Sequence, residues 1–270
     1  MKLSIITISF NQAEYLEQAL LSVLDQDYDD VEYIVVDAGS SDGSREIIER
    51  YRDRIATIIF EPDDGPADGL NKGFAQATGD ICGYLNADDG FLPGAFSQVV
   101  EIFQSRPEID VICGDGYIVD QDGAMIRRFR SDPFNARRYA LGGVTVMQQS
   151  TFFRRAAFTA VGGFNADNAT SWDGELVFEM SLAGFRFTVA HHYWSIFRVH
   201  GDSITGSQRM AHISVMNWNR YFERYFGRPI RPSDKWIKLW GRIEKRLCDP
   251  IGLWVRISDK LFRASPRKPF

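Results

Sequence analysis

Two kinds of hydrophobic pattern alternate along the first hundred residues. Residues 3–9, 31–36, 55–60 and 81–85 are short, mostly apolar runs rich in β-branched residues, which is typical of buried strands in a parallel sheet. Between them, apolar residues recur at helical spacing, and this predicts helices over 13–26, around Ile47 and Ile48, and over 66–76. Strands and helices that alternate with short links indicate an α/β fold with a mostly parallel central sheet flanked by helices.

The alternation fades after residue 110. Short apolar runs at 111–113, 117–119, around Ile126 and at 144–147 predict strands of mixed direction. A helix is expected over 173–183, ended by Gly184, and a polar loop over 198–203 follows a further apolar strand.

Acidic residues recur where the early strands are expected to end. They are Asp37, then Asp63 and Asp64, then Asp88 and Asp89, after which Gly90 ends the segment. Parallel strands deliver their last residues to the edge of the sheet that binds ligands. Adjacent carboxylates repel each other unless a cation or solvent intervenes, and Mg²⁺ or Mn²⁺ prefers carboxylate oxygens. The pattern therefore favours a nucleotide–metal site, while an acidic turn that caps a helix starting near Pro93 is the alternative.

Composition narrows the class of protein. The chain has 270 residues, of which 44% are hydrophobic and 25% charged, enough for one large domain with an appendage. Its three cysteines form no CxxC pair, which disfavours a disulfide framework or a zinc site and favours a reducing compartment. The first apolar run is expected to be a strand rather than a signal peptide, and no run is long enough to span a membrane. No GxGxxG fingerprint follows that strand.

The charge is divided unevenly. Residues 207–270 contain 15 Lys and Arg against 5 Asp and Glu, a net of +10, so the net charge of −5 leaves −15 for residues 1–206. We therefore expect an acidic body over 1–206 and a basic, helical appendage over 207–270 with an anionic partner.

Aromatic residues accompany the basic residues of this appendage. Trp236, Ile237 and Trp240 begin an apolar stripe over 234–248, and a second set follows Pro250. Tryptophan on a stripe flanked by Lys and Arg is typical of an interfacial helix on anionic lipid. The alternative is a helical hairpin packed on the body, with its basic residues solvated.

Eight short motifs, in order, carry a family resemblance. They are SIITISFN (4–11), VVDAGSSDG (35–43), DGPADGLNKG (64–73), LNADD (85–89), QSTFFRR (149–155), GGF (162–164), DGE (173–175) and RVH (198–200). Over roughly residues 1–206 the sequence resembles the family 2 glycosyltransferases with the GT-A fold. The resemblance does not cover the appendage.

The resemblance implies where a nucleotide-diphospho-sugar, with a UDP-sugar favoured, would bind. Thr7 and Phe10 would border the base, Asp37 would hydrogen-bond the base or ribose, and Asp89 would face the donor sugar. The residues that it assigns to nucleotide and donor binding are Thr7, Phe10, Asn11, Asp37, Asp68, Asn71, Lys72, Asn86, Ala87 and Asp89. Asn86 stands where the family's DxD-type motif has its first aspartate, and it is expected to contact ribose instead.

The resemblance also implies the chemistry. Asp88 would bind the divalent metal, Mn²⁺ or Mg²⁺, and His200 would reach the metal or the diphosphate. Asp173 matches the catalytic base, and one base acting in a direct displacement predicts inversion at the anomeric carbon. Each role has a structural alternative: Asp173 as a helix cap, His200 as a solvated loop residue and Lys72 as a surface lysine.

The resemblance, together with these features, implies a metal-dependent, inverting transferase in bacterial surface polysaccharide assembly. The acceptor is expected to be a glycan, or a sugar linked to a lipid diphosphate, and no nucleic acid is involved. We expect the protein to be cytoplasmic, peripheral on the inner face of the membrane. The alternatives are a nucleotidyltransferase, disfavoured because no triphosphate-binding loop follows the first strand, and a non-catalytic nucleotide-sugar-binding module.

Overall fold

The computed structural model describes residues 1–168, 171–201, 211–237, 239–241, 251–252, 254–255 and 258, and for 211–218 it describes the backbone alone. The first half of the chain forms β1 (Leu3–Ser9), α1 (Ala13–Leu24), β2 (Val31–Asp37), α2 (Ser44–Arg50), a 3₁₀ turn η1 (Arg52–Arg54), β3 (Thr57–Phe60), α3 (Pro66–Gln76), β4 (Ile81–Asn86), β5 (Gly90–Phe91) and α4 (Ala95–Ser105). The second half forms β6 (Val111–Val119), β7 (Met125–Phe129), α5 (Ala136–Ala140), η2 (Gln148–Ser150), β8 (Thr151–Arg154), α6 (Arg155–Ala160), α7 (Trp172–Leu182), β9 (Phe187–Arg198), α9 (Ala211–Phe226) and η3 (Pro232–Asp234).

All of these strands join one sheet, in the order β3-β2-β1-β4-β8-β6-β9-β5, with β7 paired to β6. The first four strands are parallel, as their alternation with helices predicts. The second half is mixed: β8 runs antiparallel to β4 and β6, whereas β6 and β9 are parallel. The α/β fold with a sheet flanked by helices is therefore confirmed.

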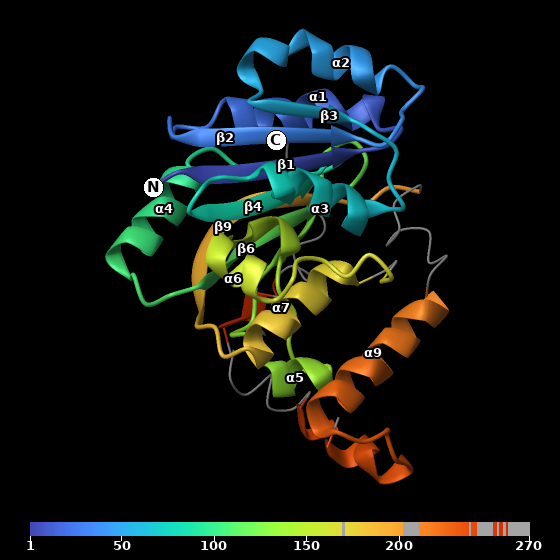
Figure 1. The fold of residues 1–270 in the computed structure, drawn as a ribbon. Coiled ribbons are helices and arrows are strands. Elements are labelled where there is room, and N and C mark those ends of the chain that lie inside the picture. Colours follow the sequence, from blue (N-terminus) through green and yellow to red (C-terminus); the bar gives the residue numbers. More distant parts are fainter. Residues whose placement is uncertain are drawn as a thin grey trace.

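Helices cover both faces of the sheet (Figure 1). On one face α1 and α4 bury Leu16, Leu20 and Phe96 against the strands. On the other face α3, α6 and α7 bury Leu70, Phe158 and Leu176 among others. Apolar residues of the strands point to both faces, which is why the strands have unbroken apolar sequences rather than alternating ones.

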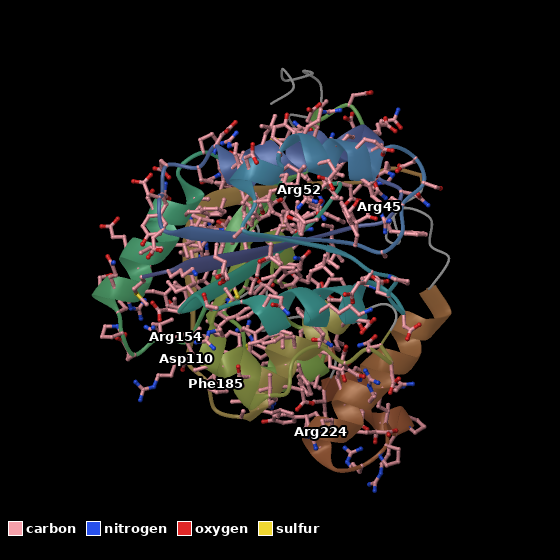
Figure 2. All side chains as sticks on the ribbon, turned by 45° about the horizontal axis from the view of Figure 1, so that its top comes forward. Arg45, Arg52, Asp110, Arg154, Phe185 and Arg224 are labelled. Atoms are coloured by element: carbon pink, nitrogen blue, oxygen red, sulfur yellow. The ribbon has the colours of Figure 1, made fainter. Side chains whose placement is uncertain are left out.

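The end of the sheet away from the carboxyl ends of β1 and β4 is held together by hydrogen bonds from main-chain N–H groups. The N–H group of Arg154 donates to the carbonyl of Asp110 at 2.8 Å, and the Asp110 carboxylate accepts from the N–H of Arg186 at 2.8 Å. Figure 2 shows Arg154, Asp110 and Phe185 together at this end. These links fix the register of β6, β8 and β9 and leave the opposite edge for ligands.

Two expectations about strands need correction. Residues 144–147 were expected to form a strand but belong to a loop, in which the N–H of Thr145 donates to the Asp132 carboxylate and the N–H of Met147 to the Ser131 hydroxyl. Their partners are side chains of another loop, so no ladder forms. Gly90 was expected to end a strand, yet Gly90–Phe91 is itself a short strand paired with β9.

Helix α9 packs on the body through residues that the sequence analysis placed in the appendage. Tyr221 and Phe222 are buried, and the Tyr221 hydroxyl donates to the carbonyl of Ser171 at 3.0 Å. Arg220 pairs with Glu175 of α7 at 2.5 Å, and Arg224 pairs with Glu179 at 3.3 Å. Helix α9 therefore supports the helix that contains Asp173.

Candidate functional site

A cavity of about 730 Å³ opens at the carboxyl ends of β1 and β4. Its polar lining comes from residues that are far apart in sequence: Ser9, Gln12, Asp63, Asn86, Asp88, Arg127, Gln148, Gln149 and Asp173. Phe10 and Trp172 provide flat apolar walls, and 58% of the Phe10 side chain is exposed. The two carboxylates assigned to metal binding and to catalysis, Asp88 and Asp173, therefore share one cavity.

Asp88 is paired with His200. The imidazole Nε2 lies 3.0 Å from a carboxylate oxygen of Asp88, and only 6% of the His200 side chain and 15% of the Asp88 side chain are exposed. The ring of Tyr15 lies 5.0 Å from the imidazole ring, centroid to centroid. His200 is therefore not a solvated loop residue but a buried partner of the predicted metal ligand.

Asp89 points away from the cavity into the protein. Its carboxylate accepts hydrogen bonds from the amide of Gln149 at 2.7 Å, the amide of Asn86 at 3.3 Å and the N–H of Arg198 at 2.9 Å. Burial raises the pKa of Asp89 well above its usual range, and the negative charge of Asp88 raises it further. Asp89 thus organises the loop around Asp88, and it does not line the cavity.

Arg198 is a second organiser of this loop. It is 3% exposed, and its guanidinium donates to the carbonyl of Asp88 at 3.0 Å, to the carbonyl of Gln121 at 3.0 Å and to the side chain of Gln18 at 2.6 Å. The same guanidinium lies 4.9 Å from the centre of the Tyr15 ring. The planar, five-donor head of arginine suits such a junction of three segments.

A divalent metal fits the residues around Asp88. The carboxylate of Asp88 and the imidazole of His200 are ligand types that Mn²⁺ and related ions accept. Among the described residues, the side-chain oxygen of Asn86 is buried without a hydrogen-bond partner, and this residue lines the same cavity. No cluster of three or more His, Cys, Asp or Glu side chains able to hold a metal occurs in the described part of the chain. Ligand oxygens would therefore have to complete the coordination, as is usual for Mg²⁺ bound with phosphates.

Asp173 lies in the first turn of α7 at the cavity wall. Burial raises the pKa of its carboxyl, while the N–H groups of Gly174 and of Asp173 itself act in the opposite direction. Gly174 packs so closely on Tyr139 that an added Cβ would lie 1.9 Å from the Tyr139 hydroxyl oxygen. The DGE motif therefore combines a poised carboxyl with a close helix contact that only glycine permits.

Asp37 is held inside its own loop. Its carboxylate accepts from the N–H groups of Gly39 and Ser40, from the Ser40 hydroxyl and from Arg45 at 2.8 Å. Burial alone would raise the pKa of Asp37, but these hydrogen bonds outweigh it and lower the pKa. Asp37 is fully buried and does not line the cavity.

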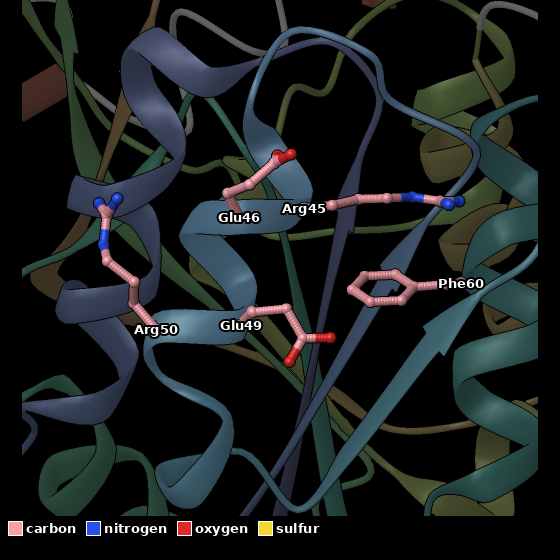
Figure 3. Close-up of a pocket in the computed structure, with 5 residues that line it drawn as sticks. All are labelled: Arg45, Glu46, Glu49, Arg50 and Phe60. Atoms are coloured by element: carbon pink, nitrogen blue, oxygen red, sulfur yellow. The ribbon is translucent and has the colours of Figure 1, made fainter.

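A shallow hollow adjoins the Asp37 loop (Figure 3). Arg45, Glu46, Glu49 and Arg50 of α2 line it together with Phe60 of β3. The Arg45 guanidinium lies 4.8 Å from the centre of the Phe60 ring. Arg45 thus contacts both Phe60 in the hollow and the carboxylate of Asp37. Its position in the sequence did not indicate this role.

The predicted residues of α3 support neighbouring loops. Lys72 pairs with Asp68 at 2.9 Å and donates to the carbonyl of Pro62, and the N–H of Asp64 donates to Asp68. The side-chain amide of Asn71 donates to the carbonyl of Phe164 and accepts from the N–H group of Phe164. These three side chains do not line the cavity.

Two residues of the first motif also lie off the cavity wall. Thr7 is fully buried, accepts a hydrogen bond from the Tyr33 hydroxyl at 2.9 Å and does not line the cavity. Asn11 has positive φ (52°), and its side chain accepts from the N–H of Ser41. Of the predicted residues, the cavity therefore brings together Phe10, Asn86, Ala87, Asp88 and Asp173, with His200 behind Asp88.

Sequence reasoning missed several residues of this site. Gln148 and Trp172 line the cavity directly, and Arg127 and Phe129 enter it from the β7 edge. Gln149 belonged to a recognised motif without an assigned role. Asp63 was recognised as an acid at a strand end, and the structure places it in the cavity wall, where burial raises its pKa.

The sequence matches the family model described as Glycosyl transferase family 2 over residues 4–162. An uncharacterised glycosyltransferase of Nostoc sp. is 38% identical over 131 residues, which cover 45% of this chain and 40% of that protein. The putative teichuronic acid biosynthesis glycosyltransferase TuaG of Bacillus subtilis is 32% identical over 133 residues, which cover 48% of this chain and 52% of TuaG. The match thus spans about half or less of these relatives' length.

Solved structures show the same fold. TarS of S. aureus in complex with UDP-GlcNAc has a TM-score of 0.64 at 17% identity, covering 84% of this chain and 72% of that chain. The mannosyltransferase PcManGT of Pyrobaculum calidifontis, in complex with GDP-Man and Mn²⁺, has a TM-score of 0.64 at 19% identity, covering 99% and 76%. With its GT-A fold and the family model matched over more than half of its length, the chain belongs to glycosyl transferase family 2.

Proposed function

We propose that the protein is a metal-dependent, inverting glycosyltransferase that moves a sugar from a nucleotide-diphospho-sugar to a glycan hydroxyl. The shared cavity of Asp88 and Asp173 is the observation on which this proposal depends. Membership of a glycosyl transferase family disfavours a nucleotidyltransferase, the alternative enzyme class.

The donor would bind with its diphosphate near Asp88 and its base toward Phe10. Asp88 and His200 would hold Mn²⁺ or Mg²⁺, and the metal would supply positive charge to the leaving diphosphate. TarS and PcManGT, which share the fold, were solved with UDP-GlcNAc and with GDP-Man and Mn²⁺, and this supports a nucleotide-sugar here. The exposed face of Phe10 suits stacking on a base.

Asp173 would act as the general base. Its carboxylate would accept the proton of the acceptor hydroxyl as that oxygen forms a bond to the anomeric carbon and the bond to the diphosphate breaks. A second cavity of about 220 Å³ also reaches Asp173 and is lined by Tyr84, Tyr139 and Gln148 among others. This cavity provides space for the acceptor on the side of the base.

The acceptor is proposed to be a glycan linked to a lipid diphosphate, in the assembly of bacterial surface polysaccharide. Support comes from relatives named for such work, TuaG and the GalNAc(5)-diNAcBac-PP-undecaprenol beta-1,3-glucosyltransferase of Campylobacter jejuni, the latter 36% identical over 104 residues. No described helix is long and apolar enough to cross a membrane.

Two substitutions test the proposal. Asp88→Ala is expected to abolish Mn²⁺-dependent binding of UDP-sugars and GDP-sugars measured by calorimetry. Asp173→Asn is expected to keep donor binding and lose turnover. Glu101→Gln, at an exposed position of α4, is the control and should retain both properties. Metal-dependent binding that survives Asp88→Ala, or a product that keeps the donor's anomeric configuration by NMR, would contradict the proposal.

A further inference from the structure

Exposed apolar side chains concentrate in the appendage. Among the described residues, seven large hydrophobic side chains are exposed, and five of them lie between residues 236 and 254. We call these five the docking surface: Trp236, Leu239, Trp240, Ile251 and Trp254. Such a concentration of exposed apolar side chains in one part of a folded protein is typical of an interaction site.

The docking surface is exposed although its segments are anchored to the body. Around 241 the chain packs so tightly that a Cβ added at Gly143 would lie 2.8 Å from the carbonyl oxygen of Gly241. Ser258 is buried and accepts a hydrogen bond from Arg128 at 2.8 Å, and Val255 is also buried. The inward-facing residues that the structure describes there, Gly241, Val255 and Ser258, therefore have small or short side chains.

The large side chains occupy the outward side. Residues 235–237 and 239–241 are helical, and the i, i+3, i+4 spacing puts Trp236, Leu239 and Trp240 on one face. Trp236 is 66% exposed, Trp240 58% and Trp254 65%. This arrangement is the reverse of an ordinary surface helix, whose apolar face is turned inward.

Positive charge accompanies the docking surface. Residues 207–270 have a net charge of +10, whereas the rest of the chain has −15. The ammonium group of Lys235 lies 5.4 Å from the centre of the Trp236 ring. Indole rings edged by lysine and arginine suit the headgroup region of an anionic bilayer, where the ring meets the acyl boundary and the cations meet phosphate.

A second copy of the chain is a poorer occupant. Pairing of two docking surfaces would bring two appendages of net +10 together. Outside the docking surface, the exposed large apolar side chains of the described residues are Phe10, at the cavity, and Tyr225. A single exposed ring is too small to cover the five side chains of the docking surface. Contact between the docking surface of one copy and a different surface of a second copy is therefore also disfavoured.

We propose that Trp236, Leu239, Trp240, Ile251 and Trp254 dock the protein on the surface of an anionic lipid bilayer. This inference goes beyond glycosyl transfer and does not depend on it, because binding to vesicles is measured without donor or acceptor. Docking of this kind would hold the enzyme at the surface where lipid-linked acceptors lie.

The first test uses the unmodified full chain. It should co-sediment with vesicles of phosphatidylglycerol and phosphatidylcholine at low salt, and bind on the order of tenfold less to vesicles of phosphatidylcholine alone or at high salt. Brominated lipids should quench tryptophan emission in the bound state. Equal binding to both vesicle types, or binding without quenching, would overturn the proposal.

The second test compares matched variants. Trp236→Ser, Trp240→Ser and Trp254→Ser together should lower binding to the phosphatidylglycerol vesicles on the order of tenfold or more while leaving the melting temperature unchanged, since all three side chains are exposed. Tyr225→Ser on α9 is the control for loss of an exposed aromatic and should bind as the unmodified chain does. Unchanged binding by the triple variant, or a dimer that becomes monomeric in that variant without a change in vesicle binding, would refute docking on lipid.

Discussion

His200 Nε2 lies 3.0 Å from the carboxylate of Asp88, although 112 positions separate the two residues in the chain. Asp88 follows β4 and His200 follows β9, and the short strand β5 pairs with β9 and so brings the two loops together. The contact gives the predicted metal ligand a buried imidazole partner.

His200→Ala should weaken metal binding without preventing folding. Loss of a ligand or of its hydrogen-bonded partner typically lowers metal affinity 10- to 100-fold, so the Mn²⁺ concentration for half-maximal donor binding should rise by about that factor. Calorimetric titration of Mn²⁺ at fixed nucleotide-sugar measures it. His192→Ala, at an exposed position of β9, is the control. An unchanged Mn²⁺ requirement in His200→Ala would remove His200 from the site.

Asp173→Asn should lower kcat by about 10²- to 10⁴-fold, because the amide cannot accept the acceptor's proton. In the unmodified enzyme, burial raises the pKa of Asp173, and only the ionised form is a base. The rate should therefore fall as pH decreases through that raised pKa, at a higher pH than for an ordinary aspartate. A pH profile of kcat checks this. If Asp173→Asn shows the same fall in kcat at low pH as the unmodified enzyme, another group causes that fall.

Arg198→Met should lower the free energy of unfolding by about 3 kcal/mol, because it removes a buried cation from several carbonyl and amide acceptors. Arg198→Lys is expected to restore little, since one ammonium group cannot replace a planar fork that bonds three segments. Denaturant unfolding measures both. Arg186→Lys, at an exposed position, should be neutral. Near-complete rescue by lysine would show that charge alone matters there.

Glu32 should make the fold sensitive to acid. Burial would raise the pKa of its carboxyl, but hydrogen bonds from Lys2, Ser4 and Thr78 lower it to about 2. Its stabilisation is therefore complete above the unfolded pKa of about 4.3 and is lost as pH falls toward about 2. We expect a loss of about 2 kcal/mol over this range after allowing for the partly exposed Lys2.

Urea unfolding at a series of pH values measures this loss. Glu32→Gln should be less stable at pH 6 and should show less additional loss on acidification. Glu101→Gln, which alters an exposed carboxylate, should follow the unmodified protein. A Glu32→Gln protein with an unaltered pH dependence would place the acid sensitivity elsewhere.

The sequence predicted the parallel half of the sheet well because each strand there is an apolar run followed by a helix with its own period. The mixed half was harder. Residues 144–147 have the β-branched composition of a strand, but the side chains of Asp132 and Ser131 accept hydrogen bonds from the N–H groups of Thr145 and Met147. No local sequence pattern indicates such partners in another loop. Gly90 is equally misleading, since its pairing with Ile196 depends on the position of β9.

In the candidate site, too, some residues could be predicted from the sequence and others could not. Asp88 and Asp173 were identified from short motifs, and both lie in one cavity. The supporting network was not predictable, because the contacts of Arg198 with Gln18 and Gln121 bridge 180 and 77 positions, respectively. Asp37 was expected to meet the ligand, yet in this structure Arg45 and Ser40 occupy its carboxylate.

Because α9 packs on α7, the protein tolerates truncation at some positions and not at others. A chain that stopped at residue 206 would lose Tyr221 and Phe222, uncover the apolar surface around Phe178 and Tyr139, and leave Glu175 without Arg220. A chain that stopped just past Gly227 would keep Tyr221 and the ion pair of Arg220 with Glu175, and it would lose the segment that bears the exposed tryptophans together with the contacts of Gly241 and Ser258 with the body. A truncation meant to separate the proposed glycosyl transfer from the proposed lipid docking should therefore be made at that glycine.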